Sequence, residues 1–260
     1  MLSRFLFYFY FYFIFILFFI KMLYTLLKDF LIEVLFMEEN KYNGNVIYNI
    51  LKKDIISLKL KPGESIKETE ISKKLNVSRT PVREAFIKLA TENLVKVTPK
   101  RGSYVSLIST TQILEGFFLR LNMEKAILFS ACKHFPPEYL IRLKENLKIQ
   151  KLLLESSQDY INFHKFDNLF HSIIYEGCGM KGIWDLIEQH CSHYHRLRVL
   201  WDSSIEAVNL NKTVQGHEKI IELIELSKDN EIETVVNNHI KTLVDTLDEL
   251  KSNFPDFFEE

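Results

Sequence analysis

Apolar side chains recur with a helical period along most of the chain. From Val46 to Leu58 they fall three or four positions apart with lysines between them, which predicts an amphipathic helix. Beyond Ile108 the helical period returns in stretches separated by Pro, Gly or Ser, and no convincing strand pattern occurs. The second half of the chain is therefore predicted to be an antiparallel helical bundle. Its predicted helices are residues 110–134, 137–156, 159–176, 181–200, 205–226 and 229–252.

The segment after the first helix predicts a helix-turn-helix. Pro62 and Gly63 end the first helix, and residues 68–75 form a short second one. After a tight connection, Thr80 is predicted to cap a third helix that has Pro81 at its first position. This succession of helix, turn and helix is typical of DNA-binding domains.

Two short strands, 94–98 and 103–105, are predicted after the third helix. The turn between them, Pro99 to Gly102, is basic and ends in glycine. Such a hairpin suits contact with phosphates or with the minor groove. Residues 42–106 are therefore predicted to form a winged helix-turn-helix, and the protein as a whole to be mostly α-helical.

The first residues of a recognition helix are the ones that reach base edges in the major groove. Arginine suits this position because it can pair with two acceptors on one guanine edge. The open alternative is that Arg79 and Arg83 form a solvated helix face and that the hairpin only closes the domain. The predicted DNA-contacting residues are Ser78, Arg79, Thr80, Arg83, Arg101 and Gly102.

Charge is divided unequally between the two halves. The net charge of the 260-residue chain is −1, yet residues 41–106 hold fourteen Lys and Arg against six Asp and Glu, a net charge of +8. Residues 107–260 have a net charge of −8. A basic module joined to an acidic one predicts that only the first meets a polyanion. The three cysteines match no zinc or disulfide framework, which fits a reducing compartment and predicts a cytoplasmic protein.

Residues 1–36 form a hydrophobic leader that is almost entirely Phe, Tyr, Ile and Leu from Phe5 to Ile20. The favoured interpretation is a wrongly assigned start, because an AT-rich stretch encodes these residues and Met37 opens a polar segment. A membrane anchor is the main alternative, although crossing a bilayer takes about 20 apolar residues. A buried or interfacial helix is the third. A signal peptide fits worse, since no small-residue cleavage site follows.

A candidate metal site lies in the acidic half. Asp167 and His171 are four residues apart and share one face of a helix, and His217 and His239 lie on later predicted helices. Three histidines and one carboxylate can hold a divalent transition metal. Spacing alone leaves the alternative that these are ordinary histidines of the core.

The N-terminal half contains Pro62-Gly63, the segment LNVSRTPVREA at 75–85, Leu94-Val95 and Arg101-Gly102. With these segments it resembles the N-terminal domain of GntR-type regulators. This resemblance implies that Arg79, Thr80 and Arg83 contact DNA, that Gly102 lies at the wing tip, and that two protomers bind a short inverted repeat. Asn93 stands where the family usually has glycine, but Asn also tolerates the left-handed conformation.

The acidic half resembles the FCD ligand-binding domain of the FadR-type GntR regulators, over segments 167–171, 216–220 and 238–240. The resemblance implies that one metal ion, commonly zinc or nickel, is held by an Asp and three His and that a small carboxylate effector completes its coordination. The four implied ligands are Asp167, His171, His217 and His239. The candidate effector-binding residues are Arg120, Arg196 and Arg198, and the alternative for Arg120 is a salt bridge with Glu124, four residues on.

The prediction for the whole chain is a homodimeric transcription regulator that binds an inverted repeat in double-stranded DNA. A small organic acid at the metal pocket would change its operator affinity, with residues 106–111 as the hinge. Whether it represses or activates is left open. One alternative is a metal-dependent hydrolase, but no motif places a carboxylate as general base, so the chain is predicted not to be an enzyme. The other is a membrane-tethered regulator, which requires that the leader is translated.

Overall fold

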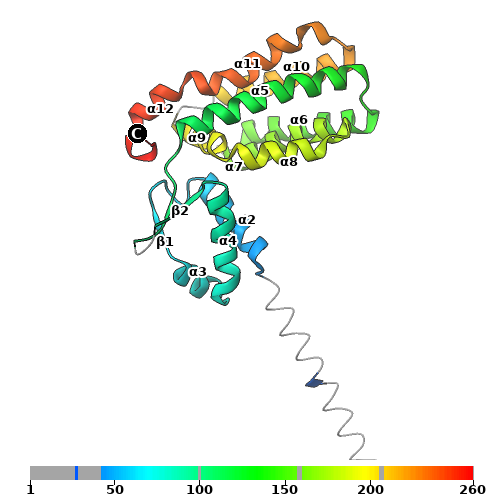
Figure 1. The fold of residues 1–260 in the computed structure, drawn as a ribbon. Coiled ribbons are helices and arrows are strands. Elements are labelled where there is room, and N and C mark those ends of the chain that lie inside the picture. The colour runs from blue at the N-terminus through cyan, green and yellow to red at the C-terminus, as the bar shows by residue number, and fades with distance from the viewer. Residues whose placement is uncertain (1–26, 29–41, 99–100, 157–159, 205–207, 260) are drawn as a thin grey trace, which may run out of the picture. The chain divides into compact units, whose positions relative to one another are not determined.

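The computed structural model describes residues 27–28, 42–98, 101–156, 160–204 and 208–259 (Figure 1). The predicted leader lies outside these ranges except for Leu27 and Lys28. Within the described ranges, no helix has the length and apolar character needed to cross a membrane. The described part of the chain divides into two compact units, one that contains residues 42–48 and 68–85 and one that contains residues 49–67 and the described residues from 86 to 259.

The elements of the N-terminal part follow the predicted order and add one short strand. The two-residue strand β1 was not predicted, because two residues are too few to show an alternating pattern. It pairs with β3, which also pairs with β2, so the antiparallel sheet has the order β1-β3-β2. The elements are α2 (Gly44–Ile56), β1 (Ser65–Ile66), α3 (Glu68–Leu75), α4 (Arg79–Thr91), β2 (Val95–Thr98) and β3 (Gly102–Val105).

Local side-chain chemistry explains where these helices begin and end. The Asn43 side chain accepts a hydrogen bond from the backbone N–H of Val46 at 3.0 Å, which caps α2. Asn76 and Asn93 follow α3 and α4 with φ of 53° and 56°, the left-handed conformation that closes a helix. The start of α4 differs from the prediction. Thr80 is the second residue of this helix and not its cap, because the helix already begins at Arg79.

The C-terminal part is a bundle of helices, as predicted, but two predicted helices are broken. Residues 181–200 divide at Cys191, whose φ of −89° and ψ of 16° end α8. Residues 229–252 divide at Thr246. Neither break has Pro or Gly to signal it. The elements are α5 (Thr110–Lys133), α6 (Pro137–Ser156), α7 (Tyr160–Gly177), α8 (Lys181–His190), α9 (Ser192–Ser204), α10 (Val208–Leu226), η1 (Asp229–Glu231), α11 (Ile232–Asp245), α12 (Leu247–Asn253) and η2 (Pro255–Phe257).

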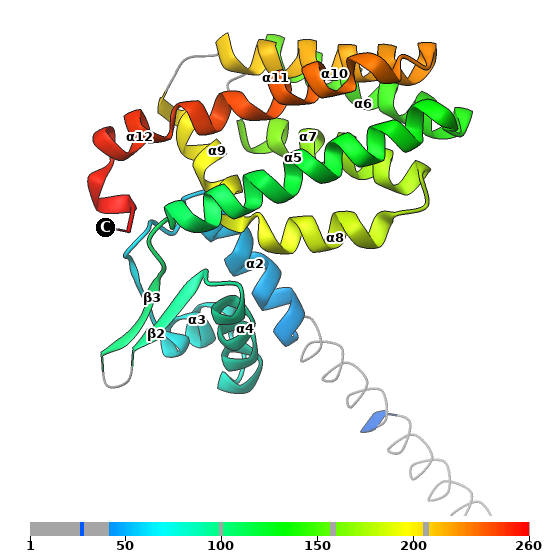
Figure 2. The same cartoon turned by 45° about the horizontal axis from the view of Figure 1, so that its top comes forward.

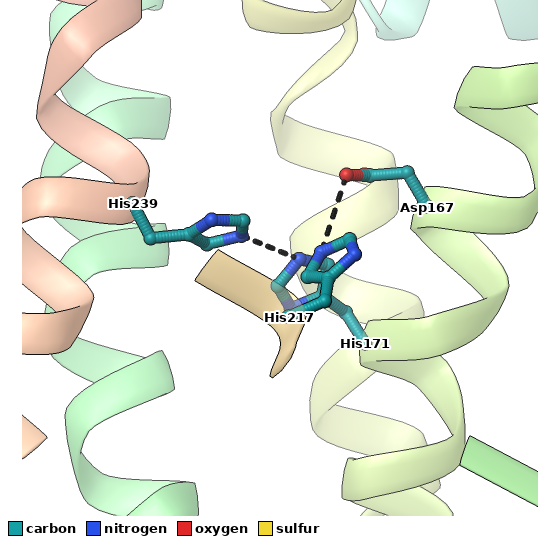
Figure 3. A group of neighbouring side chains, drawn as sticks. All are labelled: Asp167, His171, His217 and His239. Carbon is teal, nitrogen blue, oxygen red and sulfur yellow. Dashed lines mark hydrogen bonds and ion pairs between the residues drawn. The ribbon is translucent and has the colours of Figure 1, made fainter. Parts of the chain in front are cut away.

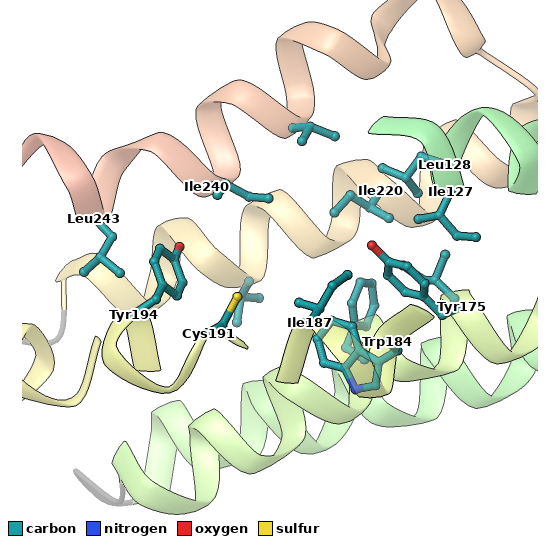
Figure 4. Packing of buried hydrophobic residues seen from close by; sticks show 14 of the residues in the cluster. Ile127, Leu128, Tyr175, Trp184, Ile187, Cys191, Tyr194, Ile220, Ile240 and Leu243 are labelled. Carbon is teal, nitrogen blue, oxygen red and sulfur yellow. The ribbon is translucent and has the colours of Figure 1, made fainter. Parts of the chain in front are cut away.

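Helix α5 organises the bundle, since it packs against α7, α8, α9, α10 and α11 (Figure 2). Apolar side chains from these helices meet in one core, where Tyr175 and Trp184 lie close to Ile187 (Figure 4). Burying each such side chain contributes roughly 1.5–3 kcal/mol to stability. Ile108 of the linker belongs to the same core and forms a parallel bridge with Phe258. Because this core is closely packed, it fixes the distances between polar side chains that come from different helices.

Candidate functional site

Four potential metal ligands converge inside the bundle (Figure 3). Asp167 and His171 lie one turn apart on α7, His217 comes from α10 and His239 from α11. One ligand atom from each lies within 4.8 Å of every other. His217 Nε2 is 3.5 Å from Asp167 Oδ1, and His239 Nε2 is 3.3 Å from His171 Nε2. Residues separated by up to 72 positions along the sequence thus form one cluster.

A close approach of two helices brings His239 into the cluster. Gly216, next to His217 on α10, lies directly against the His239 ring. A Cβ atom at position 216 would be only 2.4 Å from His239 Nδ1. Glycine is therefore required here to let the imidazole of α11 reach the other ligands.

The tautomer of His217 is set by α6. His217 Nδ1 lies 2.8 Å from Gln150 Oε1, and Gln150 Nε2 donates to Asn146 Oδ1 at 2.7 Å. Since the amide nitrogen of Gln150 is engaged, its oxygen faces the histidine and accepts the Nδ1 proton. His217 Nε2 is then a lone-pair acceptor. It has no hydrogen-bond partner among the described residues and faces the carboxylate of Asp167.

A buried carboxylate lies behind His171 in a similar way. His171 Nδ1 is 2.9 Å from Glu124 Oε1, and Arg120 Nε is 3.4 Å from the same oxygen. A carboxylate at Nδ1 favours the tautomer in which Nε2 is free for a metal. Burial by itself would raise the pKa of Glu124, but the adjacent His171 and Arg120 outweigh it and lower this pKa. Glu124 therefore carries its negative charge inside the bundle.

Asp167 is ionised although its side chain is buried. Burial opposes ionisation, but Arg198, whose Nη2 lies 2.7 Å from Oδ2, together with His171 and His217, holds the pKa of Asp167 well below its usual range. Burial lowers the pKa of His217 far below its ordinary value, and a second contribution comes from His239. Burial and His171 lower the pKa of His239 to about 3. At neutral pH the cluster thus offers one carboxylate and the neutral imidazoles of His217 and His239, the forms that bind metals.

The dimensions of the cluster fit a divalent metal ion. Zinc holds N and O ligands at about 2.0–2.2 Å, so its ligand atoms lie about 4 Å apart or less. The largest separation here, 4.8 Å, exceeds that limit by about 1 Å, which small side-chain rotations can close. Without a cation, the lone pair of His217 Nε2 and the charge of Asp167 repel each other. A divalent ion would remove this repulsion.

A cavity opens beside the cluster and is lined by Asp167 and His239 themselves. Arg120, Arg198 and Lys212 bring three positive charges to its wall against the one carboxylate. This excess favours an anionic ligand. The remaining lining residues are Tyr194, Trp201, Thr213, Asn238, Ile240 and Leu243.

The candidate DNA-contacting side chains all face solvent. Val82, Ala85 and Leu89 bury one face of α4, and the opposite face exposes Arg79, Thr80 and Arg83 in its first two turns. Ser78, just before the helix, Arg101, in the turn before β3, and Gly102, the first residue of β3, are exposed as well. Gly102 has φ of 107°, a conformation that favours glycine. Pro99 and Lys100 of the predicted wing turn lie outside the described residues.

Comparison with known proteins gives a family match for each of the two parts of the chain. Residues 43–105 match the family "Bacterial regulatory proteins, gntR family", and residues 115–242 match the FCD domain. The chain is 30% identical over 214 residues to the transcriptional repressor RspR of Escherichia coli K12, covering 82% of this chain and 92% of the relative. It belongs to the GntR family of transcription regulators. The matched families and relatives are regulators and not enzymes, as predicted.

Further comparisons agree with this membership. A regulator from an unstable DNA locus of Streptomyces ambofaciens is 29% identical over 216 residues, covering 83% of this GntR chain and 89% of that protein. The structure of E. coli McbR/YncC superposes with a TM-score of 0.68 at 20% identity, over 81% of this chain and 98% of that one. A putative GntR regulator from Rhodococcus sp. RHA1 superposes with a TM-score of 0.60 at 21% identity, over 80% of this chain and 97% of that one. The fold of the regulator is therefore the predicted winged helix with a helical bundle.

The bundle of this GntR regulator brings together most of the residues that the sequence singled out. Asp167, His171, His217 and His239 cluster, and Arg120 and Arg198 line the adjacent cavity. Arg196 does not line this cavity. Its Nη2 donates instead to the Ser106 carbonyl oxygen of the linker, at 2.8 Å.

Two contributions to the site were missed. The spacing in the sequence pairs Glu124 with Arg120 alone, yet Glu124 also contacts His171. No role was predicted for Gln150, although Gln150 is fully buried and contacts His217. The available signal was a pair of polar residues, Asn146 and Gln150, four apart on the mainly apolar inner face of α6.

Proposed function

We propose that this regulator controls transcription in response to a small anionic metabolite, which binds next to a divalent metal ion in the FCD bundle. The observation that carries the proposal is the convergence of one ionised carboxylate and three imidazoles within 4.8 Å. A metal ion bound there would attract an anionic ligand as a Lewis acid. The side chains of the protein would hold the ion, and the positively charged cavity wall would orient the metabolite.

The metal proposal is tested by calorimetric titration of the metal-free full chain with Zn²⁺. The expected result is one tight site per chain, and His217→Ala should weaken binding by a factor of about 100 or more because it removes a ligand. His190→Ala is the matched control, since His190 is exposed and, among the described residues, forms a hydrogen bond with the Leu186 carbonyl of its own helix α8. Equal Zn²⁺ affinity in both variants would reject the proposed site.

For the small organic acid, the proposal rests on the three cationic side chains that line the cavity. Arg120 and Arg198 lie within 4 Å of Asp167, so an effector carboxylate that reached the metal would also reach a guanidinium. Arg198→Met is therefore expected to weaken effector binding, while Zn²⁺ remains bound. Zinc-loaded protein screened by thermal shift against small mono-, di- and tricarboxylates would identify the class.

For the DNA end, we propose that Arg79, Thr80 and Arg83 enter the major groove of an inverted-repeat operator. Arg83→Ala should weaken binding to a selected operator by about 1–3 kcal/mol and relax the preference at one base pair. Lys148→Ala, which removes one exposed charge from α6, is the control for net charge. Since RspR is a repressor by name, we propose that occupancy of the operator represses transcription.

We also propose a homodimer whose contact surface is formed by α5 and α8. These helices pack side by side. The large apolar side chains that they expose are Leu114, Phe118 and Phe129 on α5 and Ile183 and Leu186 on α8. The side chain of Phe118 is 69% exposed, and the exposure of so much aromatic surface to water is unfavourable. Two protomers would match the two halves of an inverted repeat.

Sedimentation equilibrium tests the dimer. Phe118→Asp should produce monomers and weaken operator binding, because a charge would be buried in the contact. Ile141→Asp is the matched control: Ile141 is 58% exposed on α6, outside the proposed surface, and its replacement should leave the dimer intact. A dimer lost equally in both variants would contradict the assignment to α5 and α8.

A further inference from the structure

Helix α9 presents one face to the cavity beside the candidate metal centre. Tyr194, Arg198 and Trp201 line that cavity, and their spacing of four and three residues places them on one side of the helix. Arg198 is tied to α7 twice, through Nη2 to Asp167 Oδ2 at 2.7 Å and through Nη1 to Asn168 Oδ1 at 3.1 Å. Any ligand that engages Asp167 or Arg198 must alter these contacts.

The adjacent face of α9 holds the linker that leads from β3 into α5. His193 Nδ1 accepts a hydrogen bond from the Ser109 backbone N–H at 3.0 Å. One turn further along, Arg196 Nη2 donates to the Ser106 carbonyl oxygen at 2.8 Å. Two side chains of α9 therefore hold the linker at both ends.

The C-terminal segment holds the middle of the linker. Ile108 N–H donates to the Phe257 carbonyl at 2.7 Å, and Glu259 N–H donates to the Ile108 carbonyl at 3.1 Å. Ile108 is fully buried. The linker is thus a fixed part of the bundle whose conformation depends on groups that surround it.

Burial of the charged Arg196 side chain destabilises the fold, so stability alone does not explain this residue. It is fully buried, and its Nε and Nη1 atoms have no hydrogen-bond partner among the described residues. Buried polar groups normally have hydrogen-bond partners. A buried arginine with one hydrogen bond therefore stabilises the packing less than an apolar side chain of similar size would. Among the described residues, its one hydrogen bond is to the linker, which indicates a role in controlling that segment.

We propose that α9 couples the metal and effector pocket to the linker, with Arg198 as the input and Arg196 and His193 as the output. This rests on the proposed function. When Asp167 binds a cation, its charge is shared with the ion and its pair with Arg198 weakens. The helix then shifts as a rigid element in a close-packed bundle, and its hydrogen bonds to Ser106 and Ser109 change. The linker transmits this change toward the DNA-binding part.

The test combines Zn²⁺ titration with hydrogen–deuterium exchange of residues 106–113 in the full chain. In the wild type, saturating Zn²⁺ should change exchange in this segment by about fivefold or more, the lower range of allosteric couplings. Arg196→Met should bind Zn²⁺ with wild-type affinity but lose the change, and Arg196→Lys should restore part of it. Arg142→Met is the matched control, because Arg142 is on the bundle surface, where it forms an exposed ion pair with Glu176 and stacks on Tyr139.

The proposal is overturned if bound Zn²⁺ leaves linker exchange unchanged in the wild type, or if the change persists in Arg196→Met. A wild-type chain that fails to bind Zn²⁺ instead contradicts the proposed metal centre, on which the coupling depends. If Arg196→Met does not fold, His193→Phe provides the second variant. It preserves ring volume, removes the acceptor for Ser109 and should also abolish the change.

Discussion

At the scale of single residues, the side chains behind the candidate ligands matter as much as the ligands. Gln150 and Glu124 each face the Nδ1 atom of a histidine, so that Nε2 of His217 and of His171 points into the cluster. An imidazole has two nitrogens, and only the one that lacks a proton can bind a metal. The partners on α5 and α6 therefore decide which nitrogen is available.

Replacement of Glu124 by Gln tests this role. The amide keeps the size of the side chain but removes the charge that holds the Nδ1 proton of His171, so Zn²⁺ affinity should fall by about 10–100-fold. Competition with a fluorescent chelator measures the change. Glu115→Gln is the control, since Glu115 is exposed on the same helix. An unchanged affinity in Glu124→Gln would show that the contact with His171 has no such role.

Gly216 provides a second test at the residue scale. In Gly216→Ala the new methyl group would meet His239 Nδ1 at 2.4 Å, so the ring or α10 must move. The expected cost is about 1–3 kcal/mol in the free energy of unfolding, as for other overpacked sites. Gly182→Ala, on α8 with nothing within 4 Å of the added Cβ, should instead stabilise the protein slightly. Urea denaturation distinguishes the two.

At the scale of elements, the break between α8 and α9 is the feature that shapes the site. In a continuous helix over residues 181–200, the helical repeat of α8 would fix the directions of all side chains after Cys191. The break at Cys191 gives α9 a direction of its own, with Arg198 toward Asp167 and Arg196 toward Ser106. Two arginines only two positions apart thereby serve different parts of the molecule.

The end of α4 offers a test of local backbone energetics. Asn93 has φ of 56°, and a β-carbon in this region costs about 1–2 kcal/mol unless the side chain compensates. Asn93→Ala should lower the free energy of unfolding by about 1 kcal/mol, whereas Asn93→Gly should preserve or raise it. Thermal denaturation of the pair checks this. Equal losses in both variants would mean that the side chain of Asn93, and not its backbone conformation, matters.

At the scale of the whole molecule, charge is segregated along the chain, and a few ionised groups lie in the interior of the bundle. The basic half suits a polyanion, and the acidic half buries Arg120, Glu124, Asp167 and Arg196. Buried charges and neutral histidines make the stability of the bundle depend on pH. The dependence should be strongest below neutrality, where histidines gain protons in the unfolded chain.

His193 makes this dependence measurable. Burial and the charge of Arg196 lower its pKa to about 4, below the ordinary 6.5, so the unfolded state binds the proton more tightly than the folded state. The stabilisation is therefore complete above pH 6.5 and is lost as the pH falls toward 4. Between pH 7 and pH 5 the loss should be about 2 kcal/mol. In His193→Gln, urea denaturation should show a shallower dependence over this interval, and an unchanged slope would contradict the shift.

The sequence by itself determined the order and type of most elements. Apolar positions three and four apart predicted α2 and most of the bundle, and Asn93 marks a helix end that is local in origin. Pro62 and Gly63 lie beyond the actual end of α2 at Ile56, after which Leu58 has a φ of 58°. The pattern from Leu75 to Ala85 predicted the helix-turn-helix, and the family match confirmed it. Such features depend on neighbouring residues in the chain, which is why they can be inferred without tertiary contacts.

Only the tertiary structure decided how the candidate site is assembled. The helix breaks at Cys191 and Thr246 have no Pro or Gly to signal them. The different directions of Arg196 and Arg198 follow from the first of these breaks. The contacts of Glu124 and Gln150 with two histidines join different helices, so no spacing along one helix reveals them. Periodicity predicts which face of a helix is buried, but the partner that it meets there depends on the packing of the whole bundle.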